Sequence, residues 1–314
     1  MTQQLAKSTN LETRIETPFD FALTVAKPAG WYWSTPGEMF EDGTLWAALN
    51  LGATPVGLKL SSDGDGFVRA VAYTASALSR SKRERLLAAI ENGLGKDTDI
   101  GAFYTFAEKD PILTRVVRDL HGMRVGRLDD LFGRVILTIT LQMAQLPRSQ
   151  RMMGDVLEHY GTVLEFDGRQ VVIWPTPAKI ARLDQAELRS RANLGYRAKL
   201  LSGAARYLVE NPMSILELDE LPDEEALKQV RAIPGVGQYS AGIVLGRYAP
   251  IDAWSVIVMS ELLLGRTPVK PREEIGKINK LIDRRWGRFS WLAFAYILND
   301  LENLQADYNL TRLS

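Results

Sequence analysis

The hydrophobic pattern of this 314-residue chain changes from a period of two to a period of 3.6 at about residue 110. Before that point, apolar and β-branched residues come in short runs separated by Gly, Asp and Ser, which is typical of an antiparallel sheet. The runs expected to form strands are Phe19–Val25, Thr44–Asn50, Val56–Leu60 and Phe67–Tyr73. Ser81–Asn92 is amphipathic and predicts a covering helix. Residues 1–110 are therefore predicted to form an N-terminal antiparallel β-sheet domain.

After residue 110, apolar residues recur every three to four positions, and Asp, Ser or Pro opens several of the segments. The expected helices are Pro111–His121, Leu128–Met143, Ser149–Tyr160, Pro177–Leu183, Gln185–Arg191, Tyr196–Glu210 and Asp223–Ala232. The exception is Val163–Trp174, where Asp167-Gly168 lies between two β-branched runs and predicts a hairpin. We therefore predict an α+β protein that is mainly α, with residues 111–314 forming a helical domain.

The composition excludes several kinds of site. The chain has no cysteine, which excludes disulfides, thiolate nucleophiles and iron-sulfur clusters, and its only histidines are His121 and His159. Lys+Arg and Asp+Glu both number 38, so any contact with nucleic acid has to be local. No apolar run approaches the roughly 18 residues of a membrane span, and the first ten residues lack the layout of a signal peptide. We expect a cytoplasmic protein with no metal or cofactor.

The most specific motif is Ile233-Pro234-Gly235-Val236-Gly237, which joins two predicted helices, the second being Gln238–Tyr248. Because Gly235 and Gly237 lack β-carbons, the backbone can present consecutive N–H groups where the second helix begins. Such a turn can bind a phosphate through the main chain, with little need for lysine or arginine. The pattern by itself is equally compatible with a corner between two helices that uses glycines for close packing.

This hairpin, with Asp252 opening the next helix, resembles the helix-hairpin-helix DNA glycosylase superfamily. The resemblance covers nearly the whole chain and is strongest to the branch of 3-methyladenine DNA glycosylase II and 8-oxoguanine DNA glycosylase. Its other landmarks are Asp97–Tyr104, His121–Arg124, Leu131–Gln142 and Leu194–Lys199. It implies a two-lobed helical bundle with the sheet domain attached and an active cleft between the lobes. The interval from Gly237 to Asp252 is several residues shorter than in the family, which predicts a second helix shorter by about one turn, or a trimmed loop after it.

The resemblance implies that the protein excises a damaged base, with Asp252 as the catalytic residue. A fixed carboxylate beside the deoxyribose stabilises the positive charge that develops as the base leaves. The alternative role for Asp252 is only to cap the helix that starts at Ala253. Bifunctional members have a lysine where this chain has Tyr239, and tyrosine cannot form an imine, so the resemblance implies an enzyme without lyase activity. Because the sequence identifies no general acid, alkylated purines that already carry positive charge are the favoured substrates.

An enzyme that flips a base needs an aromatic pocket and a residue that fills the vacated space. The candidates for the pocket are Tyr239, Trp254, Trp31 and Trp33, each of which could instead be core packing. The candidates for phosphate contact at the hairpin are Gly235, Val236, Gly237 and Tyr239. The candidates for the wedge that enters the DNA stack are Met143, Gln145 and Leu146. Further contacts with phosphates could come from Arg148, Arg197, Lys199, Arg266, Lys270 and Arg272.

Other functions stay open at this point. The chain could be a DNA-binding or lesion-sensing protein that has lost catalysis, which the shortened interval before Asp252 would explain. It could also be a glycosylase for deaminated or oxidised purines, or an N-glycosidase for small molecules that does not need DNA. We expect the binding partner to be double-stranded DNA that contains damaged bases. We also expect the protein to be a monomer that associates with the nucleoid in the cytoplasm.

Overall fold

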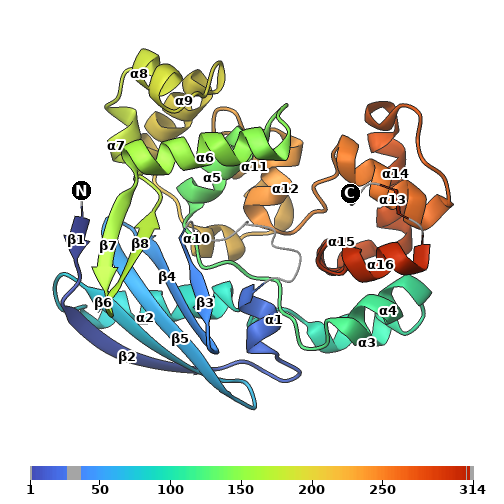
Figure 1. The fold of residues 1–314 in the computed structure, drawn as a ribbon, viewed down its shortest axis with the longest axis horizontal. Helices are drawn as coiled ribbons and strands as arrows, with labels where there is room; N and C mark the ends of the chain where they lie inside the picture. The colour runs from blue at the N-terminus through green and yellow to red at the C-terminus, as the bar shows by residue number, and fades with distance from the viewer. Residues whose placement is uncertain (1, 27–36, 309, 312–314) are drawn as a thin grey trace.

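The computed structural model describes residues 2–26, 37–308 and 310–311 (Figure 1). Its N-terminal part contains a five-stranded antiparallel sheet with the strand order β2-β6-β5-β4-β3. The strands are β2 (Lys7–Arg14), β3 (Met39–Glu41), β4 (Thr44–Leu51), β5 (Thr54–Gly64) and β6 (Phe67–Thr74). The strands predicted within residues 44–50, 56–60 and 67–73 are confirmed, and α2 (Arg80–Gly93) confirms the predicted covering helix.

The strand predicted at Phe19–Val25 is wrong, because these residues contain helix α1 (Phe21–Ala26). Asp20 begins the helix, since its Oδ1 accepts a hydrogen bond from Leu23 N at 2.8 Å. Phe21 and Val25, one helical turn apart, are both buried in the core beneath the sheet. In so short an apolar run, spacing alone does not distinguish a strand from a buried helix.

The predicted hairpin is confirmed as β7 (Thr162–Phe166) and β8 (Arg169–Ile173), but its position was not predicted. Asp167 and Gly168 have φ values of 52° and 70°, as a tight turn of this kind requires. A short N-terminal strand, β1 (Thr2–Gln4), pairs with β7 in parallel, so the hairpin lies against the N-terminal domain. Phe166 packs so closely on Gly57 that a β-carbon there would lie 2.5 Å from its ring.

The helices form two lobes, each around its own hydrophobic core (Figure 1). The first lobe contains α5 (Leu131–Leu141), α6 (Leu146–Tyr160), α7 (Pro177–Ala181), α8 (Gln185–Arg191), α9 (Arg197–Glu210), α10 (Ile215–Asp219), α11 (Asp223–Arg231) and α12 (Gln238–Leu245). The second contains α3 (Ile100–Ala107), α4 (Pro111–Asp119), α13 (Ala253–Leu264), α14 (Pro271–Trp286), α15 (Ser290–Asn299) and α16 (Leu301–Tyr308).

This arrangement confirms the mainly α, two-lobed α+β fold, and every helix predicted after residue 110 is present. The division into domains at residue 110 stays a prediction. Helix α3 precedes that residue and contributes Phe103 to the core of the second lobe. None of the helices in the described part of the chain has the length and apolar character needed to cross a membrane.

Asp167 connects the β7–β8 hairpin to the five-stranded sheet. Its carboxylate accepts hydrogen bonds from Trp46 Nε1 at 2.8 Å and Tyr73 Oη at 3.0 Å, and it pairs with Lys59 Nζ at 2.9 Å. Burial opposes ionisation of Asp167, but the hydrogen bonds from Trp46, Lys59 and Tyr73 outweigh it and lower the pKa of the carboxyl group below its usual 3.8. The turn that the sequence predicts therefore also attaches the hairpin to the five-stranded sheet.

We predict that Asp167→Asn lowers the free energy of unfolding at pH 7 by about 1 to 3 kcal/mol. Because the folded-state pKa lies below the unfolded value, this contribution is complete above roughly pH 4 and is lost as the pH falls through the folded-state pKa. Urea unfolding at pH 7 and pH 3 measures the effect, and the difference between the two proteins should shrink at the lower pH. An equal difference at both pH values would contradict this assignment.

Candidate active site

The two glycines of the Ile233–Gly237 turn have different roles. Gly235 has a φ of +85°, a left-handed conformation that favours glycine, and a β-carbon there would lie 3.1 Å from Leu200 Cβ on α9. Gly237 has an extended backbone, and no atom of the described residues lies within 4 Å of the position of its missing β-carbon. Gly235 is thus required by the backbone and by packing, whereas Gly237 keeps the surface at the start of α12 open.

The first amide groups of α12 lack acceptors within the helix. Gly237 is the N-cap and has no side chain to cap the helix, and the first helical bond runs from Ala241 N to Gly237 O at 2.9 Å. The amides of Gly237, Gln238 and Tyr239 precede that bond and have no acceptor in the helix. The Val236 amide, in contrast, donates within the turn. The start of α12 therefore presents N–H groups and the positive end of the helix dipole to an anion.

Asp252 is the N-cap of α13 and forms a reciprocal capping box with Ser255. Ser255 N and Oγ both donate to Asp252 Oδ1 at 2.8 Å, and Ser255 Oγ accepts from Asp252 N at 2.7 Å. Capping is therefore confirmed, and it engages one carboxylate oxygen. No hydrogen bond to Oδ2 occurs within the described residues, and the side chain is only partly buried. Capping thus leaves Oδ2 available for another interaction.

Tyr239 of the first lobe lies within electrostatic range of Asp252, which opens a helix of the second lobe. Burial, and then the charge of the Asp252 carboxylate, raise the pKa of Tyr239, so the phenol is neutral at physiological pH. Trp254 is partly buried and packs on the core of the second lobe. Trp31 and Trp33 lie outside the described residues. Of the predicted pocket residues, Tyr239 is the one whose pKa the Asp252 charge raises.

The three candidate wedge residues are all exposed, Met143 and Gln145 in the turn between α5 and α6, and Leu146 as the first residue of α6. Met143 is 75% exposed and has a φ of 49°, and Leu146 is 47% exposed. Gln145 is the N-cap of α6 and makes no capping hydrogen bond through its side chain. Two large apolar side chains are therefore exposed where α5 gives way to α6.

Gln142 joins this turn to the hairpin. Its Nε2 donates to Gly235 O at 2.6 Å, and its own carbonyl oxygen accepts from the Arg197 guanidinium and from Tyr196 Oη at 3.4 Å. Because Arg197 is only 2% exposed, it positions the turn and does not reach phosphates as the sequence had suggested. Tyr196, which donates to this turn, is 53% exposed. It was not among the predicted site residues, and the sequence offered no signal for it besides its place within the Leu194–Lys199 landmark.

Helix α12 is short, and two arginines, one buried and one partly buried, hold its C-terminal end. The helix ends at Gly246, which has a φ of +65°. Arg127 and Arg134 each donate to a carbonyl of its last turn, at 2.6 and 2.9 Å, and Asp129 pairs with both. Burial lowers the pKa of Arg127 to about 9, so it stays protonated at neutral pH. These cations complement the negative end of the helix dipole. The sequence did not predict this arrangement.

The other basic residues proposed as phosphate contacts differ in whether they form ion pairs within the protein. Arg266 pairs with Glu274, and Lys270 pairs with Glu273 at 2.9 Å. Arg148, Lys199 and Arg272 are exposed. Within the described ranges, no group of three or more His, Asp or Glu side chains is arranged to hold a metal ion.

No protein-family model matches this chain. Among curated proteins it is similar to a DNA-3-methyladenine glycosylase of Bacillus subtilis (strain 168), with 26% identity over 204 residues, which are 63% of this chain and 67% of that protein. Among solved structures it is similar to a 3-methyladenine DNA glycosylase from Archaeoglobus fulgidus, with a TM-score of 0.71 and 17% identity, covering 93% of this chain and 99% of that one.

A second solved structure is an 8-oxoguanine glycosylase/lyase of Clostridium acetobutylicum in its apo form. Its TM-score is 0.68 at 18% identity, and the match covers 94% of this chain and 97% of that one. At these identities the structures show the fold, which extends over nearly the whole of each chain. Together with the curated relative, they confirm the resemblance to the helix-hairpin-helix DNA glycosylases.

Proposed function

We propose that this chain, which has the fold of the helix-hairpin-helix DNA glycosylases, hydrolyses the glycosidic bond of a damaged base in duplex DNA and does not cut the strand. The observation that carries the proposal is the partly buried Asp252 carboxylate, whose Oδ2 accepts no hydrogen bond from the described residues and whose charge acts on Tyr239 at the start of α12. A curated relative named as a DNA-3-methyladenine glycosylase supports it. A similar structure, the Clostridium acetobutylicum glycosylase/lyase with double-stranded DNA, supports DNA as the partner.

In this proposal, DNA lies across the hairpin and the α5–α6 turn. The free amides at Gly237 and Gln238 bind a phosphate, so the neutral net charge of the chain is no obstacle. Met143 or Leu146 enters the stack where the damaged nucleotide has left it. Gln142 fixes the distance between these two contacts because it bonds the hairpin directly. The phosphate and the wedge are therefore positioned as one unit.

The chemical step needs little beyond a fixed negative charge. As the C1′–N bond lengthens, positive charge builds on the deoxyribose, and the free Oδ2 of Asp252 stabilises it. Water then adds to C1′, with its proton accepted by the carboxylate or by solvent, and leaves an abasic site. Tyr239 has no amine and cannot form the imine on which strand cleavage by a lyase depends. The products are the free base and an intact strand that carries an abasic site.

Alkylated purines fit this site better than neutral bases do. A neutral base must be protonated as it leaves, and near Asp252 the phenol of Tyr239, with its raised pKa, is too weak an acid to do this. A purine that already carries positive charge leaves as a neutral molecule and needs no acid. Its charge would also be stabilised over the ring of Tyr239 by about 1 to 2 kcal/mol.

An oxidised purine is the second candidate substrate, favoured by the fold shared with the Clostridium acetobutylicum 8-oxoguanine glycosylase/lyase. Excision of a neutral oxidised base requires a proton donor in the pocket. The two candidates therefore differ in their dependence on pH. Excision of an alkylated base should persist at high pH, whereas excision of an oxidised base should fall as the donor loses its proton.

We predict that Asp252→Asn reduces single-turnover excision roughly 100- to 1,000-fold, because it removes the charge that stabilises the transition state. Asparagine also caps helices well, so α13 and the thermal stability should be preserved. Asp184→Asn is the control, since the Asp184 side chain also caps a helix, α8, and is exposed outside the site. Near-normal excision by a folded Asp252→Asn protein would remove the carboxylate from the mechanism.

We also predict that Gly237→Val weakens binding to duplex DNA roughly 10- to 100-fold, whichever base is present. Its side chain would occupy the open space in front of the α12 amides and block one or two charge-assisted hydrogen bonds to phosphate. Because that space is empty, the variant should fold. Gly101→Val on α3, where a β-carbon also meets nothing, is the control. Unchanged affinity in fluorescence anisotropy would exclude the hairpin as the phosphate site.

A further inference from the structure

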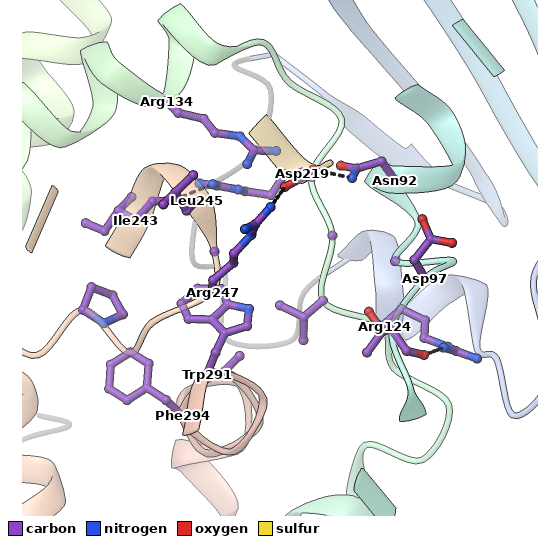
Figure 2. Close-up of a pocket in the computed structure, with 18 of the residues that line it drawn as sticks. Asn92, Asp97, Arg124, Arg134, Asp219, Ile243, Leu245, Arg247, Trp291 and Phe294 are labelled. Carbon is purple, nitrogen blue, oxygen red and sulfur yellow. Dashed lines mark hydrogen bonds and ion pairs between the residues drawn. The ribbon is translucent and has the colours of Figure 1, made fainter. Parts of the chain in front are cut away.

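Six residues, 246–251, connect α12 with Asp252, and Arg247 is the second of them. Arg247 lines an inter-lobe cavity of about 530 Å³, which lies at the C-terminal end of α12 between Ile243 and Trp291 of α15. Figure 2 shows its guanidinium directed at a carboxylate of the first lobe. The contacts that hold Arg247 therefore determine where the chain starts on its way to Asp252.

The Arg247 guanidinium binds four acceptors of the first lobe, two backbone carbonyls and two carboxylates. They are Leu218 O at 2.8 Å, Leu221 O at 3.0 Å, Asp219 Oδ1 at 3.3 Å and Asp223 Oδ1 at 2.8 Å. A planar guanidinium that donates to four fixed acceptors is held in both position and orientation. Arg247 thus fastens the start of the connection to the first lobe.

The connection then passes from the core of the first lobe to that of the second within two residues. Tyr248 packs on the first core, whereas Ala249 packs on the second and Ile251 is buried in it. Pro250 has a fixed φ and keeps the preceding residue extended, and Ile251 N donates to Ala249 O at 3.0 Å across it. So short and stiff a crossing passes a displacement at its start on to the N-cap of α13.

Gly242, in the middle of α12, allows the connection to run back along the helix. A β-carbon there would lie 3.2 Å from Tyr248 O and 3.6 Å from Pro250 Cβ, so the returning chain lies against the helix at this point. The path to Asp252 is therefore defined twice, by the Arg247 contacts and by the close approach at Gly242.

We propose that Arg247 is a positioning residue for the Asp252 carboxylate. This inference rests on the proposed function, because it matters only if that carboxylate stabilises the charge on the deoxyribose. The first lobe also carries the hairpin amides, so Arg247 sets the distance between the phosphate contact and the carboxylate. Four of its five N–H groups bond the first lobe, so it acts through Asp252. A misplacement of about 1 Å in an active site lowers a rate on the order of 100-fold.

The test measures single-turnover excision from a duplex with one 7-methylguanine, an alkylated purine that carries a positive charge. Arg247→Gln should lower the rate at saturating enzyme roughly 10- to 100-fold. Arg247→Lys should lower it less, because lysine keeps the charge but cannot bind four acceptors at once. Affinity for a duplex with a tetrahydrofuran abasic-site analogue should stay within about twofold, since a loss confined to the chemical step leaves binding unchanged.

A double-mutant cycle separates positioning from a merely structural role. If Arg247 acts through the carboxylate, Arg247→Gln should change the rate less than about threefold once Asp252→Asn is present. A general loosening of the fold would lower the rate equally in both backgrounds. Arg115→Gln is the matched control and should excise at the wild-type rate. Arg115 of α4 also pairs with two carboxylates, Asp119 and Asp307, and its side chain is 25% exposed, against 18% for Arg247.

Gly242→Ala tests the same path without removing a charge. The added β-carbon has to displace the Tyr248 carbonyl by a few tenths of an ångström, which should lower the excision rate roughly threefold or more. Alanine favours the helix, so the thermal stability should not fall. This variant and Arg247→Lys carry the test if Arg247→Gln does not fold.

Each other outcome has a distinct meaning. If the wild-type protein yields no abasic sites, or if Asp252→Asn excises normally, the proposed function or its mechanism fails, and the inference fails with it. If Asp252→Asn is impaired but folded Arg247→Gln excises normally, or acts equally in both backgrounds, the inference alone fails. A loss of DNA affinity with an unchanged rate at saturation would also overturn it. Circular dichroism and thermal unfolding show whether each variant is folded.

Discussion

The site depends on two helix starts from different lobes, α12, whose first amides have no acceptor within the helix, and α13, which Asp252 caps. Geometry explains why the short interval between them is tolerated. An eight-residue helix is about 12 Å long, and the six residues from 246 to 251 can span up to about 20 Å when extended. The chain can therefore return from the end of α12 to the level of Tyr239, where Asp252 raises the phenol's pKa together with burial.

Like every helix, α12 leaves its last carbonyl groups without partners inside the helix, so its C-terminal end needs support from outside. Arg127 and Arg134 supply it by bonding the last carbonyls of α12, and Asp129 balances their charge. Arg127 comes from the segment that leads out of the second lobe, and Arg134 comes from α5 of the first. Leaving any of these buried groups without its partner would cost several kcal/mol, so the three act as one unit. The position of the hairpin is thereby linked to both lobes.

Local rules predicted most of this structure, and the failures have physical causes. The hairpin glycines, the Asp167-Gly168 turn and the Asp252 cap follow from backbone geometry and could be read directly. Phe19–Val25 was misassigned because a short apolar run fits either a strand or a buried helix. The Gln142–Gly235 bond and the inter-lobe cavity join segments about 100 residues apart or more, and a single sequence contains no signal for such contacts. Arg197 was a candidate for phosphate contact because the sequence does not show that its side chain is buried.

The central claim is that the chain releases a damaged base and leaves the strand whole. The most direct measurement incubates the purified protein with duplexes that each carry one lesion, a 3-methyladenine mimic, hypoxanthine, 8-oxoguanine or uracil, and compares strand breaks before and after alkali. The account predicts breaks only after alkali, with the alkylated purine as the preferred substrate. Breaks before alkali would mean that an amine attacks the sugar, and tight binding with no breaks on any duplex would indicate a sensor without catalysis; either result would contradict the account.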